Sequence, residues 1–337
     1  MNYTISEAEN YEISERKRIR KRAFLASMIC ALACLLMFGL EVFISLFYYD
    51  LQGLIRSFVV STGLPYDIID TVTDMLFYIV YLTVPFAIAN LIFTFGFKEK
   101  DNYKPLHKSP KKLLLYIPAV IGGGYAINLL NETLFGSFFD KFLTPDEPLP
   151  TSVLGIILTF ISTAVLPALL EEWAFRKTIL KNLLPYGKIW AMLFSSFLFG
   201  IMHLDPLRII FASFIGFLMA LCYEYTRSIK ITMLVHFLNN AISVTFGYLA
   251  QDETAAANTI YNLLSSLIVY GCIGCFIAAA IYYLITGFKH KKIAFDKPTH
   301  IGRKLYSGEF IIVSLLNPGT ILFLLGTSFV FYLSFLA

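Results

Sequence analysis

The chain alternates between long apolar runs and short polar stretches. Apolar runs of about 18 or more residues are typical of membrane-spanning helices, because about 20 residues of α-helix cross a bilayer's hydrocarbon core. The fold class that this pattern predicts is all-α, a polytopic transmembrane helical bundle of about eight to nine spans. The spans are expected at 24–48, 74–97, 113–134, 151–180, 189–204, 207–225, 231–250, 259–287 and 319–336. Asn317-Pro318-Gly319 has the pattern of a helix start, so 309–316 can form a separate interfacial helix before the last span.

Composition agrees with this pattern. Of the 337 residues, 57% are hydrophobic and 15% are charged, against about 45–50% and about 25% in soluble domains. No soluble domain of useful size remains outside the apolar runs. We therefore divide the chain into a polar, basic N-terminal segment at 1–22, expected to be mobile and cytoplasmic, and a membrane domain at 23–337.

Charge along the chain predicts an orientation. Basic residues gather at 16–22, 98–112, 227–230 and 288–304, and acidic residues occupy the intervening connections. The positive-inside rule places the N-terminus and the basic loops in the cytoplasm of a multi-pass cell-membrane protein. The basic run at 16–22 directly abuts a span, so we interpret it as a topology signal facing the lipid bilayer and expect no nucleic-acid partner.

The five cysteines all lie in apolar runs. Cys272 and Cys275 have CxxC spacing, but no second pair and no βαβ pattern accompanies them, so we expect small packing residues and no disulfide framework. The first hydrophobic segment is too long for the core of a cleavable signal peptide.

The segment 151–184 is apolar until Glu171 and Glu172, which are followed by Arg176. Charges within a span cost a few kcal/mol each and usually mark a site or a pathway. Glu172 and Arg176 are four residues apart and can form an ion pair on one helix face. Glu171 points about 100° away from Glu172 and is left to face another partner.

Two histidines fall in predicted spans. Glu171 lies 13 residues before the end of its segment (184 − 171), and His203 lies 14 residues after the next span begins (203 − 189). At about 1.5 Å per residue, both lie about 20 Å from the same membrane face. His236 and Asn240 share one face of a later span at a comparable level. The other histidines, His107, His290 and His300, lie in basic loops.

Each of these residues also has a structural interpretation. A single intramembrane histidine can be a hydrogen-bonded packing residue, an asparagine can join two helices, and a Glu–Arg pair can stabilise one helix. Glu41 and Asn90 also lie in predicted spans. No partner for them is identifiable in the sequence, and we assign them to packing or to the lipid edge.

As a set, the site residues have the chemistry of peptide hydrolysis. A carboxylate and an imidazole can position and deprotonate water, and a second imidazole with a carboxamide can donate hydrogen bonds to a developing oxyanion. This mechanism needs no serine or cysteine nucleophile. Ser195 and Ser196 are therefore expected to be small packing residues.

Three motifs occur in order: Glu171-Glu172-x-x-x-Arg176, Phe199-x-x-x-His203 and His236-x-x-x-Asn240. Their order and spacing resemble the CAAX protease and bacteriocin-processing (Abi) family. These proteins are intramembrane glutamic endopeptidases that include the type II CAAX prenyl endopeptidase. The resemblance covers about residues 150–250 and implies a protease core of antiparallel helices there.

The resemblance also implies roles for the first two motifs. Glu171 is the general base that activates water, and His203 shares that water. Glu172 and Arg176 hold the geometry of the site, and Phe199 shapes the pocket one turn from His203.

The third motif supplies the oxyanion hole, from His236 and Asn240. The implied enzyme is an intramembrane peptidase that needs no metal and no other cofactor. Its substrate is a peptide or membrane-protein segment, such as a leader peptide or bacteriocin.

Three alternatives remain open. Two histidines and a glutamate can bind catalytic zinc, although the HExxH motif is absent. Intramembrane Glu, His and Arg can form the proton relay of a proton-coupled transporter, although we find no inverted repeat. A non-catalytic member of the family can act as a bacteriocin-immunity or scaffold protein.

Overall fold

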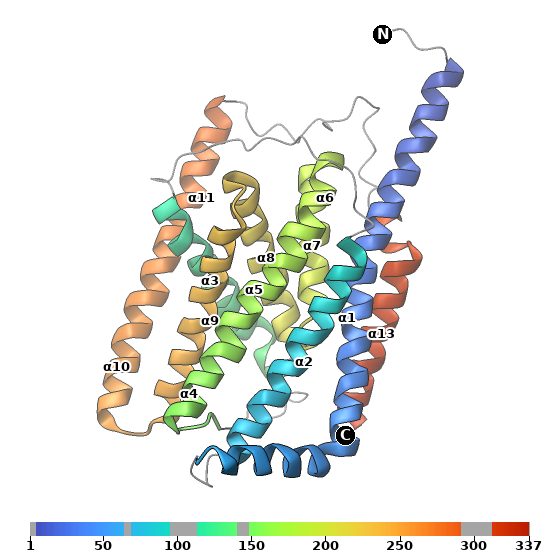
Figure 1. Cartoon of the computed structure of the whole chain (residues 1–337). Helices are drawn as coiled ribbons and strands as arrows, with labels where there is room; N and C mark the ends of the chain where they lie inside the picture. Colours follow the sequence, from blue (N-terminus) through green and yellow to red (C-terminus); the bar gives the residue numbers. More distant parts are fainter. Residues whose placement is uncertain (1–4, 64–68, 95–112, 140–147, 291–311, 337) are drawn as a thin grey trace.

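A computed structural model describes residues 5–63, 69–94, 113–139, 148–290 and 312–336. Every regular element within these ranges is helical, and the helices form one bundle (Figure 1). The all-α polytopic bundle predicted from the sequence is confirmed. Helices long and apolar enough to cross a membrane are found at Ile13–Ser61, Thr71–Phe93, Val153–Tyr186, Arg208–Thr226, Ile229–Gln251 and Ala255–Tyr282, and shorter apolar helices at Lys188–Ile201 and Pro318–Tyr332.

The N-terminal helix α1 (Ile5–Ser61) is longer than the expected span at 24–48. Residues 5–22, expected to be mobile, are helical and continuous with the span. Ile19 and Arg22 are buried, and Glu15 forms an ion pair with Arg18 at 3.2 Å, so this polar segment packs as part of the helix. The last part of α1 lies across the lower end of the bundle (Figure 1).

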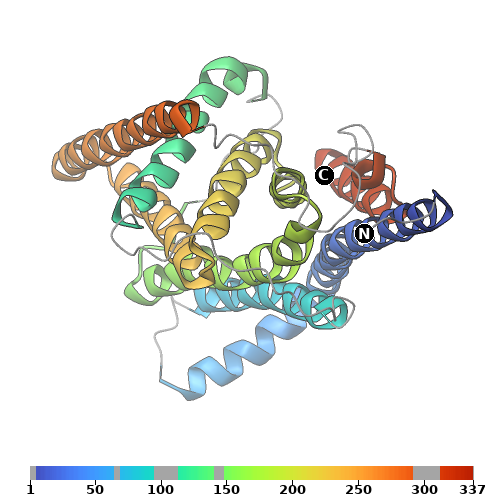
Figure 2. The same ribbon diagram turned by 90° about the horizontal axis from the view of Figure 1, so that it is seen from above.

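The outer helices lie on two sides of the bundle. In Figure 2, α13 (Pro318–Leu336) lies beside α1 at one side, and α11 (Gly271–His290) lies beside α3 (Leu113–Phe139) at the other. The helix start expected at Asn317-Pro318-Gly319 is therefore confirmed. The basic stretch 98–112 and most of 288–304 lie outside the described residues, as do 309–311 of the expected interfacial helix.

The charged segment 151–184 forms one continuous rod that is not a regular α-helix throughout. Two π-helical stretches interrupt it, one before and one directly after the glutamate pair. The rod comprises α4 (Val153–Thr159), η4 (Phe160–Val165), α5 (Leu166–Glu172), η5 (Trp173–Leu180) and α6 (Lys181–Leu183). Such π-turns are rare and occur frequently at functional sites.

A tight turn reverses the chain after this rod. The 3₁₀ turn η6 (Leu184–Tyr186) leads to Gly187, whose φ of 151° favours glycine. The next helix, α7 (Lys188–Ile201), runs back antiparallel to the rod. The predicted helical hairpin is confirmed.

Two long helices complete the centre of the bundle. α8 (Pro206–Thr226) packs against α7, and α9 (Ile229–Gln251) packs against α5 and η4. α2 (Ile69–Thr94) lies against α5 from the other side. The glutamates on α5 are therefore enclosed by helices that come from distant parts of the chain.

Candidate active site

The innermost contact is the ion pair between Glu172 and Arg176. The Nε of Arg176 lies 3.2 Å from Oε2 of Glu172, and both side chains are 0% exposed. Arg176 also donates from a terminal nitrogen to the carbonyl of Gly216 on α8 at 3.3 Å. The pair predicted from i, i+4 spacing therefore forms, and it ties the rod to α8.

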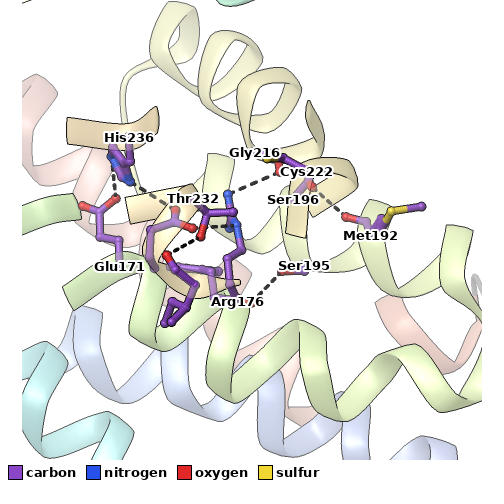
Figure 3. Close-up of polar contacts among 12 residues, drawn as sticks. Glu171, Arg176, Met192, Ser195, Ser196, Gly216, Cys222, Thr232 and His236 are labelled. Atoms are coloured by element: carbon purple, nitrogen blue, oxygen red, sulfur yellow. Dashed lines mark hydrogen bonds and ion pairs between the residues drawn. The ribbon is translucent and has the colours of Figure 1, made fainter. Parts of the chain in front are cut away.

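His236 joins both glutamates to α9. Its Nδ1 lies 3.2 Å from Oε1 of Glu172, and its Nε2 lies 3.8 Å from Oε2 of Glu171 (Figure 3). The Glu171 side chain is 13% exposed, and its buried Oε2 has no hydrogen-bond partner among the described residues. One imidazole thus stands between two carboxylates, one already neutralised by Arg176 and one not.

His203 lies in a turn, which differs from its expected place inside a span. α7 ends at Ile201, and the chain turns through Leu204, whose φ is 58°. The break has a local cause, because Pro206 disfavours helix in the residue before it. Asp205 then caps α8, accepting from the backbone N–H of Arg208 at 3.2 Å.

The depth of this turn is unusual. α7 has 14 residues, which is about 21 Å of helix and less than the roughly 30 Å of a hydrocarbon core. Non-helical backbone at membrane depth is tolerated only where it is buried in protein or lines a water-filled cavity. Met202, His203 and Leu204 do line a cavity of about 190 Å³.

The proton position on His203 follows from the hydrogen bond that its Nδ1 makes. Nδ1 lies 2.9 Å from the carbonyl oxygen of Phe199. Because a carbonyl oxygen only accepts, Nδ1 carries the proton, and Nε2 of the neutral ring is an acceptor. The ring therefore presents a basic nitrogen on its opposite side.

Phe199 connects the two histidines. Its ring makes edge contacts with His203 at 5.0 Å and with His236 at 6.0 Å, measured between ring centroids. The guanidinium of Arg176 lies over the same ring at 5.1 Å, and Phe175 packs against it edge-on. This buried aromatic ring fixes the positions of residues from all three motifs.

Asn240 is held by a backbone carbonyl of the rod. Its Nδ2 donates to the oxygen of Thr163 at 3.0 Å, and its Oδ1 accepts from Asn239 at 3.1 Å. Thr163 lies four residues before Pro167, whose ring nitrogen has no hydrogen for the usual helical bond. The second hydrogen of the Asn240 amide is not used in these two bonds.

The structure thus brings Glu171, Glu172, Arg176 and His236 into one contact cluster. His203 is connected to the cluster through Phe199. Asn240 lies one turn beyond His236 on α9 and makes its own contacts with the rod. The sequence favoured His203 as the partner of Glu171, whereas the contact recorded for Glu171 is with His236.

Sequence reasoning missed the π-helical stretches and the link from Asn240 to Thr163. Pro167 inside an apolar run was the available signal for η4 and for this link, because proline removes a backbone donor. Ser195 and Ser196 donate to the carbonyls of Phe175 and Met192, as packing residues do. Cys30, Cys34, Cys222, Cys272 and Cys275 are all free.

The residues that could bind a metal ion are the same glutamates and histidines. Within the described ranges, no three His, Cys, Asp or Glu side chains are grouped as ligands for a metal ion. Both ring nitrogens of His236 face carboxylates, and Glu172 is shared with Arg176. These groups are partners of one another in this arrangement.

Comparisons with known proteins point to the same region. Residues 152–242 match the family model described as "Type II CAAX prenyl endopeptidase Rce1-like". All six candidate site residues fall within that match. A protein of Bacillus subtilis (strain 168) with the name "Putative membrane peptidase YdiL" is 28% identical over 146 residues, which cover 39% of this chain.

The match to that relative is partial, because the chain covers 59% of the relative's length, which is less than two thirds. No solved structure matches the chain. The family match, the B. subtilis relative and the helical bundle agree with the resemblance drawn from the three motifs. This chain is accordingly a multi-pass membrane protein whose residues 152–242 are similar to the Rce1-like type II CAAX prenyl endopeptidases.

Proposed function

We propose that this chain is an intramembrane endopeptidase in which Glu171 activates water without a metal ion. The observation that carries the proposal is the unsatisfied Oε2 of Glu171, buried and 3.8 Å from Nε2 of His236. A buried carboxylate oxygen with no protein donor is suited to hold and deprotonate water. The substrate is a peptide bond in a membrane protein or in a leader- or bacteriocin-type peptide.

The first step is attack by water. Glu171 takes a proton from the water while the acceptor Nε2 of His203 shares the same water. The hydroxide adds to the scissile carbonyl, and the carbonyl oxygen becomes an oxyanion. The proton held by Glu171 then passes to the leaving nitrogen as the C–N bond breaks, so water and peptide become an acid and an amine.

The oxyanion is stabilised by His236 and Asn240. In the form with both ring protons, His236 donates from Nδ1 to Glu172 and presents Nε2–H to the site. Two carboxylates, one guanidinium and one imidazolium then balance in charge, which a buried cluster requires. Asn240 offers the amide hydrogen that Thr163 does not use.

The test compares variants in matched membranes. Wild type, Glu171→Gln and His203→Ala are expressed at equal levels, and membrane peptides are compared by mass spectrometry. Of these three proteins, only wild type is expected to give cleavage products. In two further variants, His236→Ala and Asn240→Ala, the cleavage rate should fall by about 10²–10³, the usual loss for one oxyanion donor. Products that persist at wild-type rate in Glu171→Gln contradict the proposed role of Glu171.

Glu172→Gln is the matched control, because it makes the same chemical change one residue away. It leaves the buried Arg176 uncompensated, which costs about 3–5 kcal/mol. We expect less folded protein for Glu172→Gln, whereas Glu171→Gln folds and loses only activity. Thermal unfolding of the two purified variants separates these effects.

Two further measurements address the alternatives. Peptidase activity that survives excess chelator supports the metal-independent mechanism. Activity that is lost in chelator and restored by added zinc favours the zinc enzyme. Proton-coupled uptake into proteoliposomes that disappears in Glu171→Gln, with no cleavage products, favours a transporter.

A further inference from the structure

A cavity of about 190 Å³ lies between α1, α2, α13 and the turn that follows α7. Four α1 residues contribute to it at spacings of three and four, so they share one helix face. The remaining lining comes from Tyr81 on α2, from His203 and its two neighbours in the turn, and from two residues of α13. The full lining is Cys34, Met37, Phe38, Glu41, Tyr81, Met202, His203, Leu204, Thr327 and Val330.

Glu41 is the one acidic side chain in this lining. It lies in the middle of the apolar helix Ile13–Ser61, where a carboxylate is costly and usually functional. The described residues give it no ion-pair partner, and its side chain is exposed. The sequence alone assigned Glu41 to packing or the lipid edge, but the tertiary structure places it in a cavity.

His203 lines the same cavity and presents its Nε2 away from the Phe199 carbonyl. Under the proposed function, this nitrogen shares the attacking water. A group bound in this cavity would therefore lie on the side of the site where His203 acts. The cavity also has the right make-up for a long amphipathic side chain, with apolar walls from Met37, Phe38 and Val330.

We propose that this cavity is a substrate subsite for a lysine or arginine side chain close to the scissile bond. The methylene groups lie along the apolar walls, as long basic side chains do elsewhere, and the cationic end pairs with the Glu41 carboxylate. This assignment rests on the proposed peptidase function, which it deepens by naming a substrate preference.

Binding to an inactive enzyme tests the subsite without needing cleavage. Glu171→Gln protein in nanodiscs of uncharged lipid is titrated with acylated fluorescent peptides. In each peptide a single lysine is moved one position along the chain, and a matched peptide carries norleucine there. At one position the lysine peptide should bind about ten- to a hundredfold more tightly, the range for hydrogen bonds to charged groups.

Variants of Glu41 assign that preference to the cavity. In the Glu171→Gln background, Glu41→Gln should abolish the lysine preference, and Glu41→Lys should shift it to a glutamate peptide. Glu253→Gln is the matched control, because Glu253 is an exposed acid in the connection between α9 and α10, and it should retain the preference. Val330→Phe, which fills the cavity from α13, should weaken binding of both peptides.

The outcomes separate this inference from the peptidase proposal. Equal binding of lysine and norleucine peptides at every position overturns the subsite, even when wild type cleaves peptides. A lysine preference unchanged by Glu41→Gln overturns it as well, provided that the variant unfolds at the wild-type temperature. A preference that depends on Glu41, with no cleavage by wild type, supports the subsite and contradicts the peptidase.

Discussion

At the scale of single residues, Pro167 leaves a backbone carbonyl free for Asn240 to bind. Proline cannot donate to the carbonyl four residues before it, and that carbonyl belongs to Thr163. The Asn240 amide donates to it instead, at 3.0 Å. One missing backbone hydrogen in the rod therefore orients a side chain on α9.

Pro167→Ala should lower kcat about tenfold and leave KM nearly unchanged. This loss in kcat is smaller than the loss expected when one oxyanion donor is removed outright. The new N–H of residue 167 competes for Thr163, and Asn240 is then held less firmly. The unfolding temperature should not fall, because alanine is the better helix former. The measurement is steady-state kinetics on purified enzyme with thermal unfolding alongside.

A double-mutant cycle distinguishes positioning from a general structural effect. In the Asn240→Ala background, Pro167→Ala should have no further effect on kcat. Effects of the two substitutions that multiply independently would contradict the coupling.

Glycines set the distances between helices at the scale of elements. A Cβ added to Gly200 on α7 would lie 1.8 Å from Oγ of Ser213 and 2.8 Å from the carbonyl of Ile209, both on α8. α7 and α8 therefore touch closely just before the His203 turn. The His203 turn connects these two closely packed helices.

Gly200→Ala should force α7 and α8 apart and destabilise the fold by about 1–3 kcal/mol, the usual cost of overpacking. The cleavage rate should fall as well, because the His203 turn moves with the end of α7. Gly274→Ala on α11 is the control, since a Cβ there meets nothing within 4 Å. Thermal unfolding and peptide cleavage are measured on both variants, and equal effects would show that the close contact is unimportant.

At the scale of the whole molecule, charge is divided between the two ends of the bundle. The start of α1, the turn before α7, the α8–α9 connection and the end of α11 share the upper end in Figure 1. Lys188 and Arg227 both pair with Glu224 there. The α9–α10 connection, which carries Asp252 and Glu253, lies at the opposite end.

This division predicts the orientation in the cell membrane. With the five native cysteines replaced by alanine, Lys230→Cys should be protected from a membrane-impermeant maleimide in intact cells. It should react in inside-out vesicles, whereas Glu253→Cys should react in intact cells, because basic connections stay in the cytoplasm. The reverse labelling pattern would contradict a cytoplasmic N-terminus.

The sequence by itself determined the membrane environment, the helical hairpin and the Glu172–Arg176 pair. Hydropathy and turn residues act over about 20 neighbouring positions, and an i, i+4 pair needs only one helix to form. The three motifs also located the region that the family comparison matches. These properties depend on residues close in the chain, so their spacing was enough.

Only the tertiary structure decided which groups meet. His236 contacts Glu172 across 64 residues, and Asn240 reaches Thr163 across 77. Such contacts depend on how each helix is rotated and how deep it lies, and the π-helical stretches alter both for the rod. For the same reason Glu41, without a partner in the sequence, lines one cavity with His203.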